Sequence, residues 1–212
     1  MRKRYGVVIL LVAIAALAGT SGPVTLPPPD MEGGRPLMQV LKERKSGREF
    51  SARELSPQVL ANLLWAAFGV NRPDGRRTAP SASNRQEIDI YAVLPDGVYV
   101  FNAKSNRLDQ VLSGDLRPAT GTQAFVAQAP LDLVYVADYS KMTNVSETDR
   151  LLYSAADTGF IGQNVYLYCA SEGLTTVIRG SIDRDALAKA LKLRPDQKIT
   201  LAQTVGYAKG AN

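Results

Sequence analysis

Along most of the chain, the spacing of hydrophobic residues switches repeatedly between the period of a helix and the period of a strand. Apolar residues at helical spacing predict a helix that begins after Ser56 and ends at Gly69, since serine favours the first cap and glycine the last. Alternation of apolar and polar residues predicts a strand over residues 86–94. A turn follows at Pro95-Asp96-Gly97 and residues 98–101 return as a second strand, so the two form a hairpin.

The second half of the chain has its clearest signal at Ser146, which with Asp149 resembles a capping box before a long helix that reaches Ser171. Near the start, Pro36 suits the first position of a short helix that ends near Arg44. The remaining predicted elements are strands over residues 131–137, 174–178 and 199–207 and a helix from Asp183 to Leu191. This order predicts an α+β class, with a central, mainly antiparallel sheet flanked by helices.

The first 34 residues have a different composition from the rest. Three cations at positions 2–4 precede an apolar run that ends in small residues, which predicts a secretory signal peptide over residues 1–18. An uncleaved membrane anchor is the alternative, but the run is short for a span of about 20 residues. Residues 19–34 are rich in proline and are expected to be an extended linker, which leaves residues 35–212 as one domain. The mature protein is therefore expected to be periplasmic or secreted, without stable membrane insertion.

Composition and charge narrow the function. The chain of 212 residues is 45% hydrophobic and 21% charged, which is typical of a globular domain with a sizeable core. Its net charge of +5 lies partly in the predicted signal peptide, and the rest is too small to indicate nucleic-acid binding. The excess still favours an anionic cofactor or substrate.

Histidine is absent, and Cys169 is the only cysteine. An internal disulfide is therefore impossible, and no Cys/His cluster exists for zinc. Nucleophilic catalysis by a Ser-His-Asp or Cys-His system is excluded as well. Any chemistry must use a bound cofactor or carboxylates, and no metal site is expected.

Two polar segments are candidates for contact with a ligand. Residues 44–50 place three cations and Ser46 beside a flexible glycine. Such a set can bind a phosphate through charge-assisted hydrogen bonds. The alternative is a solvated end of a helix, where cations are also favoured. Residues 77–86 form a polar loop of small residues, which lets a flat ligand approach the backbone. Asn84 and Gln86 offer donors and acceptors to the edge of a heterocycle, and an ordinary surface loop is the alternative.

Two further segments contain glycines at positions that indicate close packing or contact with a ligand. Gly159 and Gly162 lie inside the long predicted helix, where a glycine costs roughly 1 kcal/mol relative to alanine. A glycine is favoured where another segment of backbone packs closely on the helix. That segment belongs either to the same monomer or to the partner in a dimer, and the sequence pattern does not distinguish these two alternatives. Residues 172–180 predict a strand that ends in a glycine just before a helix. Backbone amides there could donate to a ligand, or the segment is a plain turn.

Taken in order, the four segments resemble the nitroreductase family of flavoenzymes, and most closely its SagB-type dehydrogenase branch, which includes azoline oxidases. The motifs that carry the resemblance are residues 44–50, 63–82, 157–167 and 205–207. The resemblance implies a nitroreductase-like fold, with FMN bound between the two subunits of an intertwined homodimer. It also implies hydride transfer through flavin N5, so no side chain is expected to be the catalytic group.

By resemblance, Arg44 and Ser46 would bind the FMN phosphate, and Arg48 would lie at the N1 edge of the flavin ring, where its charge favours the reduced anion. The loop around Asn84 would line the ring and the ribityl chain, partly from the other subunit, and a backbone amide near Gly180 would face flavin N5. The complete set of expected cofactor-binding residues is Arg44, Lys45, Ser46, Arg48, Ser81, Ser83, Asn84, Gln86, Val177, Ile178, Arg179, Gly180 and Lys209.

The chain departs from the family pattern after the second segment. Where the general nitroreductase pattern has Asn-x-Gln-Pro-Trp, Glu87 replaces the proline and no tryptophan follows. This difference leaves the substrate open: the donor is expected to be NAD(P)H or another reductant, and the acceptor a nitro, quinone or azoline-like compound. The alternative function is a non-catalytic flavin- or small-ligand-binding envelope protein, which reduction of the flavin by NADPH would distinguish from an enzyme.

Overall fold

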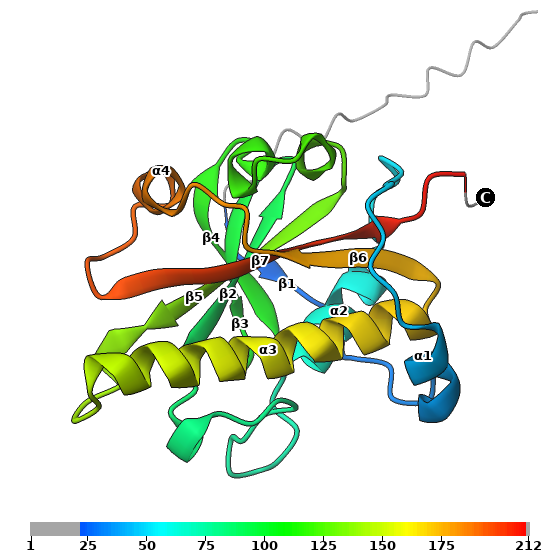
Figure 1. Ribbon diagram of the computed structural model, residues 1–212. Helices are drawn as coiled ribbons and strands as arrows, with labels where there is room; N and C mark the ends of the chain where they lie inside the picture. The colour runs from blue at the N-terminus through cyan, green and yellow to red at the C-terminus, as the bar shows by residue number, and fades with distance from the viewer. Residues whose placement is uncertain (1–21, 211–212) are drawn as a thin grey trace, which may run out of the picture.

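Seven antiparallel strands form one sheet in the computed structural model, which describes residues 22–210 (Figure 1). The strand order is β1-β4-β3-β2-β5-β7-β6. The strands are β1 (Val24–Thr25), β2 (Ile88–Leu94), β3 (Gly97–Asn102), β4 (Arg107–Ser113), β5 (Leu131–Asp138), β6 (Leu174–Arg179) and β7 (Gln197–Tyr207). The helices are α1 (Leu37–Glu43), α2 (Pro57–Phe68), α3 (Glu147–Ser171) and α4 (Arg184–Ala190). This arrangement confirms the predicted α+β class.

The predicted signal peptide, residues 1–18, lies outside the described residues. Within residues 22–210, none of the helices combines the length and the apolar character that a membrane span requires. The predicted anchor or signal therefore stays a prediction from the sequence.

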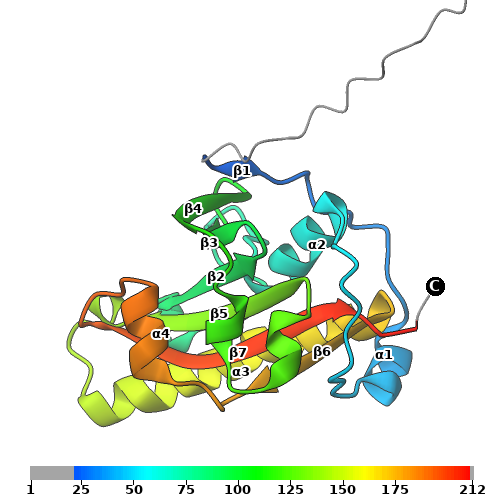
Figure 2. The ribbon, with the colours of Figure 1, turned by 90° about the horizontal axis from the view of Figure 1, so that it is seen from above.

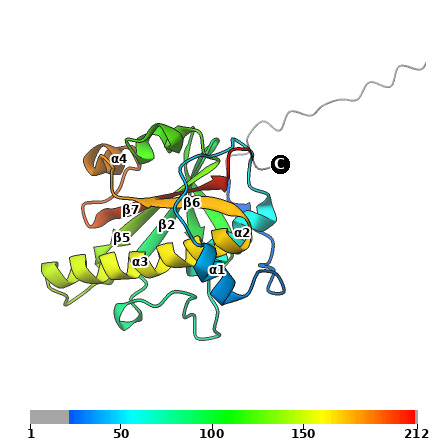
Figure 3. The same cartoon turned by 45° about the vertical axis from the view of Figure 1, so that its right-hand side comes forward.

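The central strand β5 shows how the sheet forms two hydrophobic cores. Because successive side chains of a strand point to opposite faces, Leu133 and Tyr135 pack in the core that contains α2 and α3. Val134 and Val136 pack on the other face, in the core that includes residues of α4 and its C-terminal end. All eight residues of β5 are buried. Figures 2 and 3 show α4 at the opposite side of the molecule from α1 and α2.

Three of the four helices begin where the sequence predicts, because a side chain caps each first turn. In α2, α3 and α4 the side chains of Ser56, Ser146 and Asp183 accept a hydrogen bond from the backbone amide three residues later, at 3.3, 3.1 and 3.0 Å. The 25-residue helix α3 is the longest element, and it packs on α2, β6 and β7. Its length lets it contact both regions that contain predicted site residues.

The two glycines of α3 have different surroundings. A Cβ added to Gly162 would lie 2.6 Å from Ile178 Cδ1, so this glycine lets α3 pack closely on β6 within the monomer. A Cβ added to Gly159 would meet nothing within 4 Å. Of the two alternatives left open by the sequence, close packing inside the monomer therefore applies to Gly162, whereas Gly159 faces outward.

Two segments differ from the prediction. The predicted linker is extended, but Val24–Thr25 pairs with β4 and the side chain of Leu26 is buried in the core. The folded domain therefore starts before residue 35, because both contacts anchor this segment. The hydrophobic pattern does not predict β4, in which Leu108 is the only fully buried residue. A strand near the edge of a sheet is held mainly by backbone hydrogen bonds, which leave little hydrophobic signal in the sequence.

Candidate functional site

The loop after α1 lies against the ends of β6 and β7. The Gly47 amide donates to the Thr176 carbonyl at 3.0 Å, and the Lys209 amide donates to the Glu49 carbonyl at 3.1 Å. A Cβ added to Gly47 would lie only 1.9 Å from the Thr175 hydroxyl oxygen, so the loop approaches β6 too closely for a side chain. These contacts bring the first predicted segment, the fourth segment and Lys209 to one place.

The hydroxyl of Tyr166, on α3, joins the first and fourth segments. It lies 2.8 Å from Ser46 Oγ and accepts a hydrogen bond from the Ile178 amide at 3.0 Å. With its oxygen accepting from the amide, Tyr166 can donate its proton to Ser46, and the Ser46 proton then remains available for a ligand. The guanidinium carbon of Arg44 lies 5.2 Å from the centre of the Tyr166 ring, a cation–π contact.

Sequence reasoning misses Tyr166. The residue is 8% exposed and resembles an ordinary core residue of a long helix. Its only signal is its position four residues after Gly162, on the same helix face. That face packs on β6, which is where the fourth segment lies.

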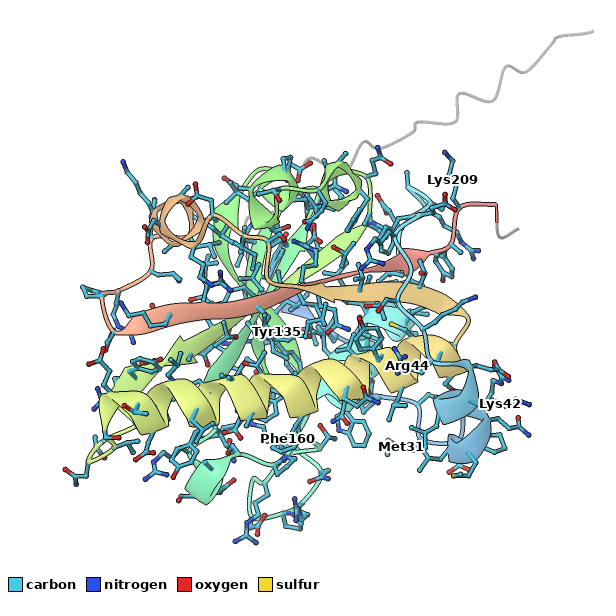
Figure 4. The ribbon with its side chains drawn as sticks, in the orientation of Figure 1. Met31, Lys42, Arg44, Tyr135, Phe160 and Lys209 are labelled. Atoms are coloured by element: carbon cyan, nitrogen blue, oxygen red, sulfur yellow. The ribbon has the colours of Figure 1, made fainter. Side chains whose placement is uncertain are left out.

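Four cations lie on the chain segments that meet here: Arg44, Lys45, Arg48 and Lys209. Within residues 22–210, none of the four forms an ion pair. The neighbouring carboxylate of Glu43 is bound by Arg35, with Nη1 2.6 Å from Oε2, and that hydrogen bond lowers the pKa of Glu43. Figure 4 shows Arg44 and Lys209 at the same side of the molecule, where α1 and the C-terminal end of β7 lie. Within the described part of the chain, no ion pair therefore offsets these four cations, although Glu49 lies in the same segment.

At the end of β6, two of the four expected residues have side chains that a ligand does not reach. The side chains of Val177 and Arg179 are buried, and Arg179 Nη2 forms an ion pair with Asp132 Oδ1 at 2.7 Å. Burial raises the pKa of Asp132 to about 6, although the adjacent guanidinium of Arg179 opposes the rise. The Ile178 amide already donates to the Tyr166 hydroxyl, so the expected role of this segment falls to the backbone at Arg179 and Gly180.

The second predicted segment lies elsewhere in the monomer. Figures 1 and 3 show its loop on the side of α3 away from β6, and the Ala82 amide donates there to Asp157 Oδ2 at 2.9 Å. Ser83 and Asn84 are exposed at the tip of the loop, with φ angles of 52° and 53°. One chain therefore does not bring these two residues to Arg44.

The side chains of Gln86 and Ser81 are engaged inside the same loop. Gln86 Oε1 accepts from Arg77 Nε at 2.8 Å, and Gln86 Nε2 donates to the Gly75 carbonyl at 3.1 Å. The Ser81 hydroxyl accepts from the Gln86 amide at 2.9 Å. Both residues were expected to contact a cofactor, and the structure shows them bracing the loop that presents Ser83 and Asn84.

A cavity of about 470 Å³ borders the cationic junction, and its lining includes Lys45, Tyr166 and Thr176. A larger cavity of about 1,010 Å³ lies between the N-terminal end of α3 and α4, and none of the predicted site residues lines it. Among residues 22–210, no group of three or more carboxylates, cysteines or histidines could hold a metal ion. The predicted chemistry therefore centres on the junction of loop, α3 and β6.

Comparison with known proteins gives consistent matches. A model of the nitroreductase family matches residues 41–207. A candidate nitroreductase of Methanocaldococcus jannaschii is 32% identical over 176 residues, which cover 78% of this chain and 88% of that protein. The crystal structure of a candidate nitroreductase of Ralstonia eutropha is 45% identical, with a TM-score of 0.87, and covers 91% of this chain and 93% of its own. An NADPH:FMN oxidoreductase of Vibrio harveyi, at 20% identity and a TM-score of 0.62, has the same fold over 82% of this chain and 69% of its own.

Proposed function

The chain belongs to the nitroreductase family, and on that premise we propose that it is an FMN-dependent oxidoreductase of the SagB-type branch. It transfers hydride from NAD(P)H or another reduced donor to a small organic acceptor, which is a nitro, quinone or azoline-like compound. One observation carries the proposal: the Tyr166 hydroxyl holds Ser46 and the Ile178 amide together, beside cations that form no ion pair within residues 22–210.

The residues at this junction fit FMN. Within residues 22–210, Arg44, Lys45, Arg48 and Lys209 form no ion pair, so their charge is available to a phosphate monoester. Ser46 adds a hydroxyl proton for the same phosphate. The chain has no Gly-x-Gly-x-x-Gly fingerprint for a dinucleotide, which favours FMN over FAD.

The protein contributes binding and position rather than a reacting side chain. When bound, FMN supplies a site at N5 that accepts and donates hydride. Arg44 and Ser46 bind the phosphate, and Arg48 places a positive charge beside the ring. The Tyr166 hydroxyl positions Ser46 and the end of β6 relative to each other. Because no side-chain nucleophile or base is required, the absence of histidine is compatible with the reaction.

The working form is a homodimer, as an exposed apolar patch supports. Leu151, Leu152 and Phe160 on α3 are 66%, 60% and 48% exposed, and Leu37 and Met38 on α1 are 60% and 76% exposed. Figure 4 shows Phe160 projecting from α3 on the side away from β7. Several large apolar side chains exposed on one helix and its neighbour are typical of a protein interface. A second copy on this face could supply its exposed loop tip to the cationic junction of the first.

A reconstitution experiment tests cofactor and activity separately. The purified protein is titrated with FMN, and flavin fluorescence gives the dissociation constant; anaerobic mixing with NADPH or NADH then gives the rate of flavin reduction. Ser46→Ala should weaken FMN binding by roughly 10- to 150-fold, because a hydrogen bond to a charged group contributes about 1.5–3 kcal/mol.

Ser105→Ala is the matched control, because this serine lies in the turn between β3 and β4, away from the junction, and should leave FMN affinity unchanged. Flavin that binds but is not reduced by either nucleotide would favour the non-catalytic binding protein. Failure to bind FMN at all would contradict the proposed function.

The mature protein is periplasmic or secreted, as the predicted signal peptide over residues 1–18 supports. Sequencing the N-terminus of protein recovered from the cell envelope or the medium should give a start near Gly19. An intact N-terminus in the soluble cytosol would contradict export.

A further inference from the structure

Glu87 and Asp157 form a buried pair of carboxyl groups where the second segment meets α3. Their side chains are almost fully buried, with residue exposures of 0% and 2%. Within residues 22–210, no other residue donates a hydrogen bond to either carboxyl oxygen of Glu87, yet its own backbone amide lies close and the carboxyl of Asp157 is within hydrogen-bonding reach. Two adjacent buried negative charges repel each other strongly, whereas one shared proton gives the pair a hydrogen bond.

The surroundings favour that proton near neutral pH. Burial raises the pKa of Glu87 to about 7, and the neighbouring carboxyl of Asp157 acts in the same direction. The backbone amide of Glu87 itself opposes the rise, and so does the cation of Lys141, although Lys141 Nζ already donates to Asp89 Oδ1 at 2.7 Å. Asp157 on α3 and Lys141 after β5 are therefore the charged groups that act on Glu87, and neither removes the need for a shared proton.

The carboxyl pair is directly linked to the exposed loop. Asp157 Oδ2 accepts the hydrogen bond from the Ala82 amide at 2.9 Å. Ser83 and Asn84 follow with φ angles of 52° and 53°, in the left-handed region that costs energy for residues other than glycine. Such a backbone persists only when several surrounding contacts fix it, and the bond to Asp157 adds one from outside the loop to those inside it.

We propose that Glu87 and Asp157 are positioning residues that share one proton, and that this proton keeps the loop of residues 81–86 in the form that contacts ligand on a partner subunit. The last clause rests on the proposed function, in which the loop tip completes the flavin site of a second copy. When the proton leaves, repulsion separates the two carboxylates and weakens the hold of Asp157 on the Ala82 amide. The loop then loosens, and ligand binding weakens as the pH rises.

Amide hydrogen exchange at Ala82 tests the shared proton without any flavin. In the wild-type protein, protection of this amide, corrected for intrinsic exchange, should fall as the pH rises through about 7, by up to about tenfold per pH unit. Glu87→Gln keeps a donor toward Asp157 and cannot ionise, so its profile should stay flat. Asp157→Asn is a second variant with the same expectation, because its amide can both accept from Ala82 and donate to an ionised Glu87.

The Asp149 amide, which donates to Ser146 Oγ at 3.1 Å in the first turn of α3, is the internal control and should show no such change in any variant. Profiles of wild type and Glu87→Gln that coincide at Ala82 would overturn the shared proton. A wild-type profile that is flat would overturn it as well.

FMN affinity measured over the same pH range tests the link to ligand binding. The wild-type dissociation constant should rise on the order of tenfold from about pH 6 to about pH 8.5, relative to that of Glu87→Gln. Ionisation of the FMN phosphate, near pH 6, affects both proteins alike and cancels in this ratio. If Ala82 exchange titrates while the ratio stays constant, the loop does not position ligand and that part of the proposal is wrong. A protein that binds no FMN refutes the proposed function, while the exchange profile still decides the shared proton.

Discussion

Gly47→Ala tests whether the loop after α1 must lie against β6. The added Cβ would come within 1.9 Å of Thr175 Oγ1 and within 3.3 Å of Thr175 Cβ. Non-bonded heavy atoms pack at about 3.5 Å or more, so either Thr175 rotates or the loop moves away by roughly 1.5 Å. A loop that moves this far loses the 3.0 Å hydrogen bond from the Gly47 amide to the Thr176 carbonyl, and with it the position of Ser46.

Both responses cost free energy. A strained rotamer at Thr175 costs about 0.5–1.5 kcal/mol, and overpacking that shifts the backbone costs about 1–3 kcal/mol. A cost of about 1–3 kcal/mol in the bound form weakens FMN binding by roughly 5- to 150-fold. Thr175→Ala removes Oγ1, so in the double variant only the 3.3 Å contact with Cβ remains, and most of the affinity should return.

Titration of wild type, Gly47→Ala, Thr175→Ala and the double variant with FMN forms a double-mutant cycle. Thr175→Ala alone should bind like wild type, because the hydrogen bond of the loop to β6 joins backbone atoms of Gly47 and Thr176 and does not use the Thr175 side chain. Urea unfolding of the flavin-free proteins, run in parallel, identifies any variant that is globally destabilised. The reasoning is refuted if Gly47→Ala binds FMN as tightly as wild type, or if the double variant folds but recovers no affinity.

Four further substitutions have distinct expected outcomes. Arg44→Ala should weaken FMN binding and leave the midpoint potential of bound flavin nearly unchanged. Arg48→Ala removes a charge that favours the reduced anion, so it should lower that potential by some tens of millivolts, since about 30 mV corresponds to 1.4 kcal/mol. An unchanged potential in spectroelectrochemistry would place Arg48 away from the ring. Asp132→Asn leaves the buried guanidinium of Arg179 without its counter-charge. The free energy of unfolding, measured by urea denaturation, should therefore fall by about 3–5 kcal/mol. A loss well under about 1 kcal/mol would contradict a buried ion pair. Phe160→Asp puts a charge into the apolar patch on α3 and should give monomers in light scattering, so a dimer that persists would exclude this face.

Local signals in the sequence determined the helices and most strands. Ser56, Ser146 and Asp183 cap their helices as predicted, because a cap depends on a side chain and a backbone amide only three residues apart. The alternating residues of β2 and β3 and the turn between them predict the hairpin for the same reason. Edge pairing was not predictable in this way: β1 and β4 pair through their backbones, and their side chains carry little pattern.

The candidate site could be predicted in part. Short motifs in the sequence identify the cations and Ser46 of the first segment and the strand end of the fourth segment. The order of these motifs along the chain resembles that of one family, which indicates that they belong to one site. Which atoms remain free to bind was not predictable. The sequence shows Arg179 and Gln86 as polar residues in candidate segments, whereas the structure buries one beside Asp132 and ties the other to Arg77.

The tertiary structure alone decided the contacts between distant parts of the chain. Tyr166 meets Ser46 across 120 positions of sequence, and Asp157 meets Ala82 across 75. Such pairs leave no local periodicity, because neither residue constrains its neighbours in sequence. Their consequences depend on the surroundings as well: a proton is shared at Glu87 only because the fold excludes water there and places a second carboxyl beside it. Burial and distance set those energies, and both arise only when the sheet and α3 have packed together.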